Sequence, residues 1–277
     1  MKKIMVFLLG CCLSFLVGCN FFTNTNKEMA EMMDLVNNAQ FDASPSVVKI
    51  YKFAYTSLDD YNDYNYDADL STLGSGVIFN YKFIEDTYYV ITNNHVTIAT
   101  TPYIRFYIYD AFGREYASVM DLEIGEANYD LAVLTFQGER GEMHLPIMTF
   151  LNRDFTSPEV VIAIGNPTGL NNVLTVGKII AIINPPLIKD SVDNDESSKS
   201  STVNVKVYHH SAPIKGGSSG GALVYYDAKS EQYYLCGINY AGGTDDNVSQ
   251  ETSSSFAIRS TSVLEYLEQH NISYYTN

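Results

Sequence analysis

Basic residues are scarce in this chain. Its 277 residues include 17 Lys and Arg against 32 Asp and Glu, which gives a formal net charge of −15. Proteins that bind nucleic acid carry a basic surface that neutralises phosphates, and this composition does not favour one. We therefore expect no nucleic-acid partner, and no strongly acidic substrate unless basic side chains gather at one site.

Cysteine is also rare, with four residues in the chain. Cys11, Cys12 and Cys19 lie in or directly after an N-terminal apolar run, which leaves Cys236 as the single cysteine of the remaining sequence. One thiol cannot form an intramolecular disulfide. Because Cys236 lies within the apolar run of residues 233–238, we interpret it as a small buried hydrophobic residue and not as a nucleophile.

The N-terminal apolar run is too short to cross a membrane comfortably. It extends from Ile4 to Val17 after Lys2 and Lys3, whereas a membrane-spanning helix needs about 20 apolar residues. A positive start followed by a short apolar run predicts an export signal. Residues 16–19, Leu-Val-Gly-Cys, resemble the bacterial lipobox, in which signal cleavage leaves the cysteine as a lipid-modified N-terminus.

We therefore predict a lipoprotein signal peptide over residues 1–18 and a lipid anchor of the palmitate type at Cys19. This predicts an extracytoplasmic protein, held by its lipid at the outer face of a bacterial cell membrane. An ordinary signal peptide with an incidental cysteine is the alternative. Residues 19–42 are expected to form the lipidated N-terminus, a polar spacer and a short helix, because apolar residues between 29 and 36 share one helical face.

Residues 43–277 are predicted to form one domain built from β-strands. Runs rich in β-branched and aromatic residues follow one another at short intervals, and turn residues separate them. One helix is expected at residues 261–271, capped by Ser260 or Thr261. The pattern predicts an all-β barrel or sandwich. The predicted strands cover residues 43–50, 74–79, 88–92, 103–108, 131–134, 160–164, 173–183, 203–208, 222–226 and 233–240.

Two polar segments are expected to be surface loops. Residues 58–70 include a run that imitates the start of a calcium-binding loop, but Ala68 stands where glycine is required and Gly74 where the bidentate Glu should lie. Residues 187–202 are polar and low in apolar content. The His209-His210 pair is not expected to bind one ion, because adjacent strand residues point to opposite faces. We predict no metal site.

A Gly- and Ser-rich segment, residues 215–223, has the composition of a tight loop that leads into a strand. Its Ser219 could act as a nucleophile if a base lies beside it. His95 follows an apolar strand pattern and stands at the turn after it, where a general base can be held rigidly. Asp130 heads the apolar residues 131–134 and could orient the imidazole. The chain order His, Asp, Ser is that of the chymotrypsin-type triad.

The same serine segment also satisfies the G-x-S-x-G pattern of α/β-hydrolases. That fold requires a helix after the serine and a catalytic histidine later in the chain. Residues 223–226 are strand-like, and the histidine that follows them, His270, lies within the predicted terminal helix. We therefore favour the chymotrypsin-type order.

Six segments of the chain resemble, in order, the trypsin-like protease domain of the HtrA/DegP family, over about residues 44–267. The resemblance implies a chymotrypsin-like double β-barrel with a C-terminal helix. It also implies a trypsin-like serine protease, a hydrolase that cleaves polypeptide substrates through an acyl-enzyme and needs no cofactor. The segments are Gly74-Ser75-Gly76-Val77-Ile78, Thr92-Asn93-Asn94-His95-Val96, Tyr129-Asp130-Leu131-Ala132-Val133-Leu134, Ala163-Ile164-Gly165-Asn166-Pro167-Thr168-Gly169-Leu170, Gly217-Ser218-Ser219-Gly220-Gly221-Ala222-Leu223 and Gly237-Ile238-Asn239.

The resemblance implies a role for each residue of the site. Ser219 would attack the scissile carbonyl, His95 would transfer the proton and Asp130 would orient His95. The backbone amides of Gly217 and Ser219 would form the oxyanion hole. The substrate backbone would pair as an added strand beside residues 238–240.

The residues expected to line the primary specificity pocket include no acid, which disfavours Lys or Arg before the cleaved bond. Small or medium apolar side chains are expected there. Relatives form trimers, so the resemblance allows a homo-oligomer of this kind, but the sequence does not determine the oligomeric state. The pocket residues are Pro213, Ile214, Ile238, Asn239 and Tyr240.

Three features depart from the family pattern. Ser218 stands where these proteases usually carry Asn or Asp, the expected PDZ domain does not follow the last helix, and the polar loop near Asp193 is extra. Two alternative functions stay open: a non-catalytic surface adhesin or peptide-binding module on a protease fold, and a lipid-anchored esterase that uses the same triad.

Overall fold

The computed structural model describes residues 27–277 except 121–124, 139–143, 186–202 and 244–253. It divides into two compact units, residues 1–38 and 39–277. A helix covers residues 27–42, where a short helix was expected. No helix of the described residues is both long and apolar enough to span a membrane. The predicted signal peptide, Cys19 and the polar loop of residues 187–202 lie outside the described residues.

Six antiparallel strands form a first closed barrel in the order β1-β2-β3-β6-β5-β4. Its core is made by alternating side chains such as Ile50, Ile78, Val90 and Leu134, all of them fully buried. Alternation places every second residue on the inner face of a strand. The strands are β1 (Val47–Tyr55), β2 (Asp67–Lys82), β3 (Thr87–Thr92), β4 (Tyr103–Tyr109), β5 (Glu115–Met120) and β6 (Ala132–Gln137).

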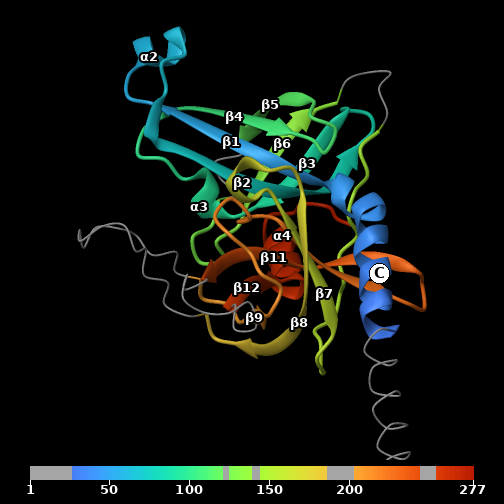
Figure 1. Cartoon of the computed structure of the whole chain (residues 1–277). Coiled ribbons are helices and arrows are strands. Elements are labelled where there is room, and N and C mark those ends of the chain that lie inside the picture. Colours follow the sequence, from blue (N-terminus) through green and yellow to red (C-terminus); the bar gives the residue numbers. More distant parts are fainter. Residues whose placement is uncertain (1–26, 121–124, 139–143, 186–202, 244–253) are drawn as a thin grey trace, which may run out of the picture. The chain divides into compact units, whose positions relative to one another are not determined.

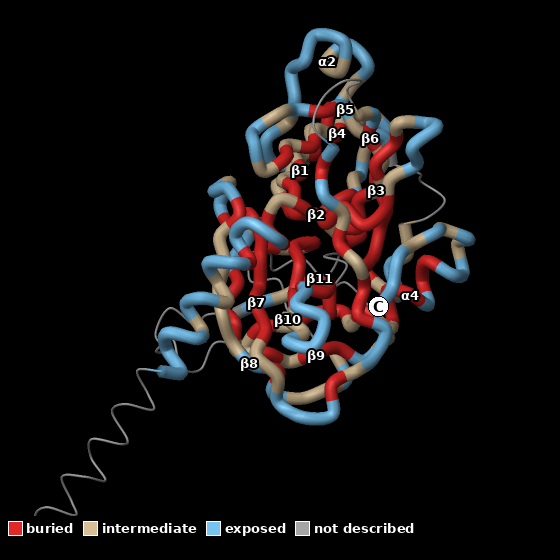
Figure 2. Tube along the Cα trace, turned by 90° about the vertical axis from the view of Figure 1, so that its right-hand side faces the viewer, coloured by how far each residue is buried: buried red, intermediate tan, exposed pale blue. Residues whose placement is uncertain are grey.

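A second closed barrel follows, in the order β10-β11-β12-β9-β8-β7. It lies below the first barrel in Figure 1, and buried residues follow the strands of both barrels in Figure 2. The prediction of an all-β double barrel with a C-terminal helix is confirmed. The strands are β7 (Val160–Gly165), β8 (Val173–Ile183), β9 (Val207–His210), β10 (Ala222–Asp227), β11 (Gln232–Gly243) and β12 (Ser254–Arg259), and the helix is α4 (Ser260–Gln269).

Short helices occur in several segments that the sequence predicts to be loops or turns. The prediction of a loop throughout residues 58–70 was wrong. Ser57 caps helix α2 (Leu58–Asp63) by accepting a hydrogen bond from the Asp60 amide, and β2 begins at Asp67. Helix α3 (Asn94–Thr97) follows β3, and the 3₁₀ turns η1 (Ser44–Ser46) and η2 (Pro167–Gly169) precede β1 and β8. The strand expected at 203–208 begins only at Val207.

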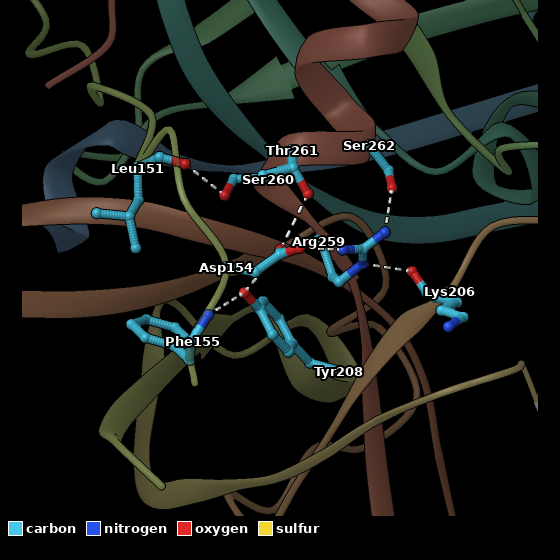
Figure 3. Close-up of polar contacts among 9 residues, drawn as sticks. All are labelled: Leu151, Asp154, Phe155, Lys206, Tyr208, Arg259, Ser260, Thr261 and Ser262. Carbon is cyan, nitrogen blue, oxygen red and sulfur yellow. Dashed lines mark hydrogen bonds and ion pairs between the residues drawn. The ribbon is translucent and has the colours of Figure 1, made fainter. Parts of the chain in front are cut away.

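The start of α4 is held by long-range contacts and not by a cap (Figure 3). The expectation that Ser260 or Thr261 caps this helix was wrong, because the N-cap is Arg259 and no side chain caps the turn. Ser260 Oγ donates to the Leu151 carbonyl at 2.6 Å, and Thr261 Oγ1 donates to Asp154 Oδ1 at 3.0 Å. Both hydroxyls thereby fasten α4 to the segment that joins the two barrels.

Asp154 is the centre of this contact. Besides Thr261, its carboxylate accepts a hydrogen bond from the Tyr208 hydroxyl at 3.2 Å and pairs with the Arg259 guanidinium. The side chains of Arg259 and Asp154 are 16% and 34% exposed, so the pair is partly shielded from water. One carboxylate thus ties β9, the end of β12 and α4 to the inter-barrel segment.

We expect Asp154→Ala to lower the free energy of unfolding by about 2 kcal/mol, because it leaves the guanidinium and two hydroxyls without their acceptor in a partly shielded place. Denaturant unfolding of the full chain measures the change. The matched control is Glu85→Ala, which removes one member of an ion pair with Lys82 at 3.7 Å whose side chains are 45% and 59% exposed. That change should stay within about 0.5 kcal/mol, and equal losses in both variants would contradict the assignment.

A histidine lies in the core of the second barrel. His210 is fully buried, and it pairs across β9 and β12 with Ser255, also buried. Burial, and to a smaller degree the neighbouring His209, lower the pKa of His210 from its ordinary value of 6.5 to about 3, and hydrogen bonds with the Asn239 side chain and the Ala212 backbone offset part of the shift. The imidazole is therefore neutral at physiological pH.

This burial predicts a pH dependence of stability. Below pH 6.5 the unfolded chain binds a proton at His210 that the folded chain does not bind until about pH 3. The stability contributed above pH 6.5 is therefore lost as the pH falls, by about 1.4 kcal/mol per pH unit. Denaturant unfolding at pH 6 and pH 4.5 should show a shallower loss in His210→Leu than in the unaltered chain. Parallel losses in the two proteins would argue against a buried neutral imidazole.

Candidate active site

His95 and Asp130 are joined by two hydrogen bonds. Asp130 Oδ2 lies 2.7 Å from His95 Nδ1, and Asp130 Oδ1 accepts from the His95 backbone amide at 2.9 Å. The Asp130 side chain is 1% exposed and that of His95 is 38% exposed. An ionised carboxylate can only accept, so Nδ1 carries the proton and Nε2 is left as an acceptor.

The backbone around Asp130 locks the two residues together. Its carbonyl accepts from the Asn94 amide at 3.1 Å and from Asn93 Nδ2 at 3.0 Å. Asp130 itself has φ +52°, in the left-handed region that an L residue adopts only at some cost in free energy. These hydrogen bonds hold that conformation and direct the carboxylate at His95.

Ser219 is half-buried in the loop that leads into β10. Its carbonyl accepts from the amide of Ser75, a residue of β2, at 2.8 Å. A Cβ at the next residue, Gly220, would lie 2.1 Å from the Ser75 carbonyl oxygen and 2.3 Å from Thr92 Oγ1. Gly220 also has φ +83°, so glycine is required there. Because Thr92 ends β3 three residues before His95, these contacts place the serine loop against the strand that leads to His95.

The amides expected to form an oxyanion hole are free. The Gly216 carbonyl accepts from the Thr168 amide at 3.0 Å, and the Gly217 carbonyl accepts from Ser75 Oγ at 2.8 Å. In a trans peptide the N–H points opposite to the carbonyl, so the Gly217 N–H points away from Thr168. Within the described part of the chain, neither the Gly217 nor the Ser219 amide donates a hydrogen bond. Both donors are available to an anionic oxygen.

Asn239 fastens β11 to the serine loop. Its carbonyl accepts from the Gly220 amide at 2.8 Å, its amide donates to Gly221 at 2.9 Å, and its Nδ2 donates to the Ala222 carbonyl at 2.8 Å. Beyond Asn239 the described pairing of β11 is with β12 alone, so the other edge of this strand has no strand partner among the described residues.

Of the remaining expected pocket residues, Ile238 and Tyr240 belong to β11 itself, Ile214 contacts that strand, and Pro213 contacts β8. Ile214 packs against Gly242 of β11, where a Cβ would lie only 2.4 Å from Ile214 Cγ1. Pro213, half-buried, accepts at its carbonyl from Thr175 Oγ1 of β8 at 2.7 Å. Ile238 is fully buried and Tyr240 is 4% exposed. Burial, and to a smaller degree the Asp130 carboxylate, raise the pKa of Tyr240.

Sequence reasoning did not assign a role to three polar residues that support the site. Ser75 Oγ accepts from the Asn166 amide at 2.8 Å, and Asn166 Nδ2 donates to the Val48 carbonyl at 3.1 Å. Asn172 Nδ2 donates to the Ser44 carbonyl at 2.7 Å. In the sequence, these residues can be recognised as polar residues that interrupt apolar strand patterns beside glycine. This pattern does not reveal which groups they bind.

Cys236 lies outside this chemistry. It is fully buried, its Sγ donates to the Leu223 carbonyl at 3.1 Å, and burial raises its pKa. A buried thiol of raised pKa is a poor nucleophile, in agreement with the interpretation of Cys236 as a core residue. Among the described residues, no three His, Cys, Asp or Glu side chains gather as a metal-binding group.

Comparison with known proteins gives consistent matches. Residues 74–230 match the trypsin-like peptidase domain family. The serine endoprotease DegS of Salmonella typhimurium is 32% identical over 66% of this chain and 43% of its own length, and the Do-like HtrA serine protease of Bacillus subtilis is 29% identical over 80% of this chain and 45% of its own. The chain thus spans less than half the length of these curated relatives.

Solved structures agree. The HtrA-type protease AlgW with a tripeptide aligns with a TM-score of 0.58 and 28% identity, over 86% of this chain and 64% of that one. A serine endoprotease from Yersinia pestis aligns with a TM-score of 0.56 and 25% identity, over 84% of this chain and 65% of that one. The family match covers more than half of the sequence, and the structural matches cover 84% and 86% of it. The chain therefore belongs to the trypsin-like peptidase domain family, and it resembles HtrA-type serine proteases in sequence and fold.

Proposed function

We propose that this protein is a serine endopeptidase that hydrolyses peptide bonds of protein substrates. The observation that carries the proposal is the buried Asp130 carboxylate, which accepts two hydrogen bonds from His95 at the end of the strand that the Ser219 loop contacts. A carboxylate so placed fixes the imidazole tautomer and stabilises the imidazolium that forms during acyl transfer.

In the proposed mechanism, Ser219 Oγ attacks the scissile carbonyl while His95 Nε2 accepts its proton. The tetrahedral oxyanion accepts hydrogen bonds from the Gly217 and Ser219 amides, each worth about 2.7 to 4 kcal/mol of transition-state stabilisation in such sites. His95 then returns the proton to the leaving amine, which leaves an acyl-enzyme on Ser219. Water, activated by His95, releases the acyl group and restores the serine.

The substrate is proposed to bind as an extended chain beside residues 238–240 of β11. This is supported by the one-sided pairing of β11 beyond Asn239, since a strand edge offers backbone donors and acceptors independent of sequence. Pro213, Ile214, Ile238, Asn239 and Tyr240 would surround the side chain before the cleaved bond. The homotrimer that the resemblance allows stays a prediction.

The test is peptidase activity of the full chain in detergent. We expect Ser219→Ala to abolish both peptide cleavage and labelling by a fluorophosphonate, and Asp130→Asn to lower kcat about 10⁴-fold, because it supplies the wrong tautomer. Ser230→Ala, an exposed serine on the β10–β11 turn, is the matched control and should keep full activity. An unaltered chain that neither cleaves peptides nor becomes labelled would favour the alternative, a non-catalytic adhesin or peptide-binding module.

We also propose that the protein is a lipoprotein anchored through Cys19 at the outer face of a bacterial membrane. The sequence of residues 16–19 supports this. In bacterial cells, Cys19→Ala should shift the protein from the membrane fraction to the soluble fraction or stop its processing, and should prevent incorporation of labelled palmitate. Cys12→Ala, inside the predicted signal, is the control and should leave both unchanged. Palmitate labelling that persists in Cys19→Ala would contradict the anchor.

A further inference from the structure

A lysine is buried in the first barrel. Lys52 of β1 is 3% exposed, and it lies on the same face of the strand as Ile50, a residue of the barrel core. Its Nζ donates a hydrogen bond to the Ile98 carbonyl. Among the residues that the structure describes, no carboxylate forms an ion pair with Lys52, and burial lowers its pKa. In that part of the chain the ammonium therefore has no counter-charge.

The acceptor of this hydrogen bond belongs to the segment that carries His95. Ile98 is the C-cap of α3, a helix of four residues. A single helical turn has little stability of its own, because its formation orders the backbone for very few hydrogen bonds. At the start of α3, the amides of Asn94 and His95 donate to the Asp130 carbonyl at 3.1 Å and to its Oδ1 at 2.9 Å. The position of α3 therefore depends on contacts outside the helix.

Two paired strand residues bind the other end of α3. Lys52 lies opposite Thr72 in the pairing of β1 with β2, so both side chains project to the same face of the sheet. Thr72 Oγ1 donates to the Val96 carbonyl at 2.9 Å, and Lys52 donates to the Ile98 carbonyl. The last carbonyls of a helix lack donors within the helix, and these two side chains supply them.

Satisfying a carbonyl does not by itself require a cation. The neutral hydroxyl of Thr72 satisfies the Val96 carbonyl, whereas a buried ammonium without a counter-charge destabilises the folded state. An unbranched apolar side chain such as Met would fill the same space without that penalty. A charged donor, however, forms a hydrogen bond roughly twice as strong as a neutral one. A residue that fixes one contact firmly while it destabilises the fold is expected where function requires the contact.

We propose that Lys52 is a positioning residue for the general base. Together with Thr72 it fixes the C-terminal end of α3, so that His95 stays paired with Asp130 and directed at Ser219. The inference rests on the proposed serine endopeptidase function, in which a displacement of the base by about 1 Å lowers the rate by about 100-fold. Substrate binding, which is proposed to use β11 of the other barrel, does not depend on this contact.

The experiment compares Lys52→Met with the unaltered full chain in detergent. We expect kcat for peptide cleavage to fall by about 10- to 100-fold while KM stays within about 2-fold, because the change displaces the base and leaves β11 intact. The midpoint of denaturant unfolding should stay equal or rise, because an apolar group replaces a buried cation. A residue with a merely structural role would instead lose stability.

A second variant and a control accompany this one. Thr72→Val removes the other donor at nearly the same volume, and it should lower kcat by about 3-fold or more with KM unchanged. Lys82→Met is the matched control. Lys82 belongs to the same barrel, but its side chain is 45% exposed, pairs with Glu85 and lies over the Tyr89 ring. This variant should keep full activity.

Unchanged kcat in Lys52→Met or in Thr72→Val would overturn the inference. Failure of Lys52→Met to fold, or a joint loss of stability and kcat, would overturn it as well. An unaltered chain that neither cleaves peptides nor is labelled by a fluorophosphonate would overturn the proposed function. The NMR resonance of the His95 Nδ1 proton, hydrogen-bonded to Asp130, then tests the position of His95 separately. It should broaden in Lys52→Met, and an unchanged resonance would overturn the inference.

Discussion

The candidate site depends on one serine of the first barrel. Ser75 is fully buried in β2 and binds three backbone groups of the second barrel: the Ser219 carbonyl, the Gly217 carbonyl and the Asn166 amide. Each hydrogen bond contributes about 1 kcal/mol net, but together they set the position of the serine loop against β3, which leads to His95. The constellation is assembled between two barrels, and neither barrel contains it alone.

Close approach of backbones at this contact determines where glycine and strained residues occur. Gly217 and Gly220 both have positive φ, and a Cβ on Gly217 would lie 2.6 Å from the Asn166 carbonyl oxygen. Asp130 takes the left-handed conformation as a non-glycine residue, and hydrogen bonds from the Asn93 side chain and the Asn94 amide compensate for it. Strain at such positions persists only where the surroundings fix it.

Polar groups in the second barrel fall into two kinds. Asp154 takes no part in the proposed chemistry. Each of its carboxylate oxygens accepts from at least one donor, and these contacts attach α4. Tyr240, close to the serine loop, buries its hydroxyl without a hydrogen-bond partner among the residues that the structure describes. A buried polar atom without a partner is expected where a protein binds a ligand or substrate. The difference separates the polar residues that stabilise the fold from those that favour a role in recognition.

The sequence by itself determined the all-β class, most of the strands and the chain order of His95, Asp130 and Ser219, because these follow from local periodicity and composition. Strand β8 has the predicted bounds, whereas β5, with Glu115, Ser118 and Ala117 among its six residues, carried too weak a pattern to be predicted. Only the tertiary structure decided the role of Ser75, the attachment of α4 and the burial of His210. Each depends on partners far away in sequence, as for Ser75 and Gly217, 142 residues apart, and closure of the barrels alone brings such partners together.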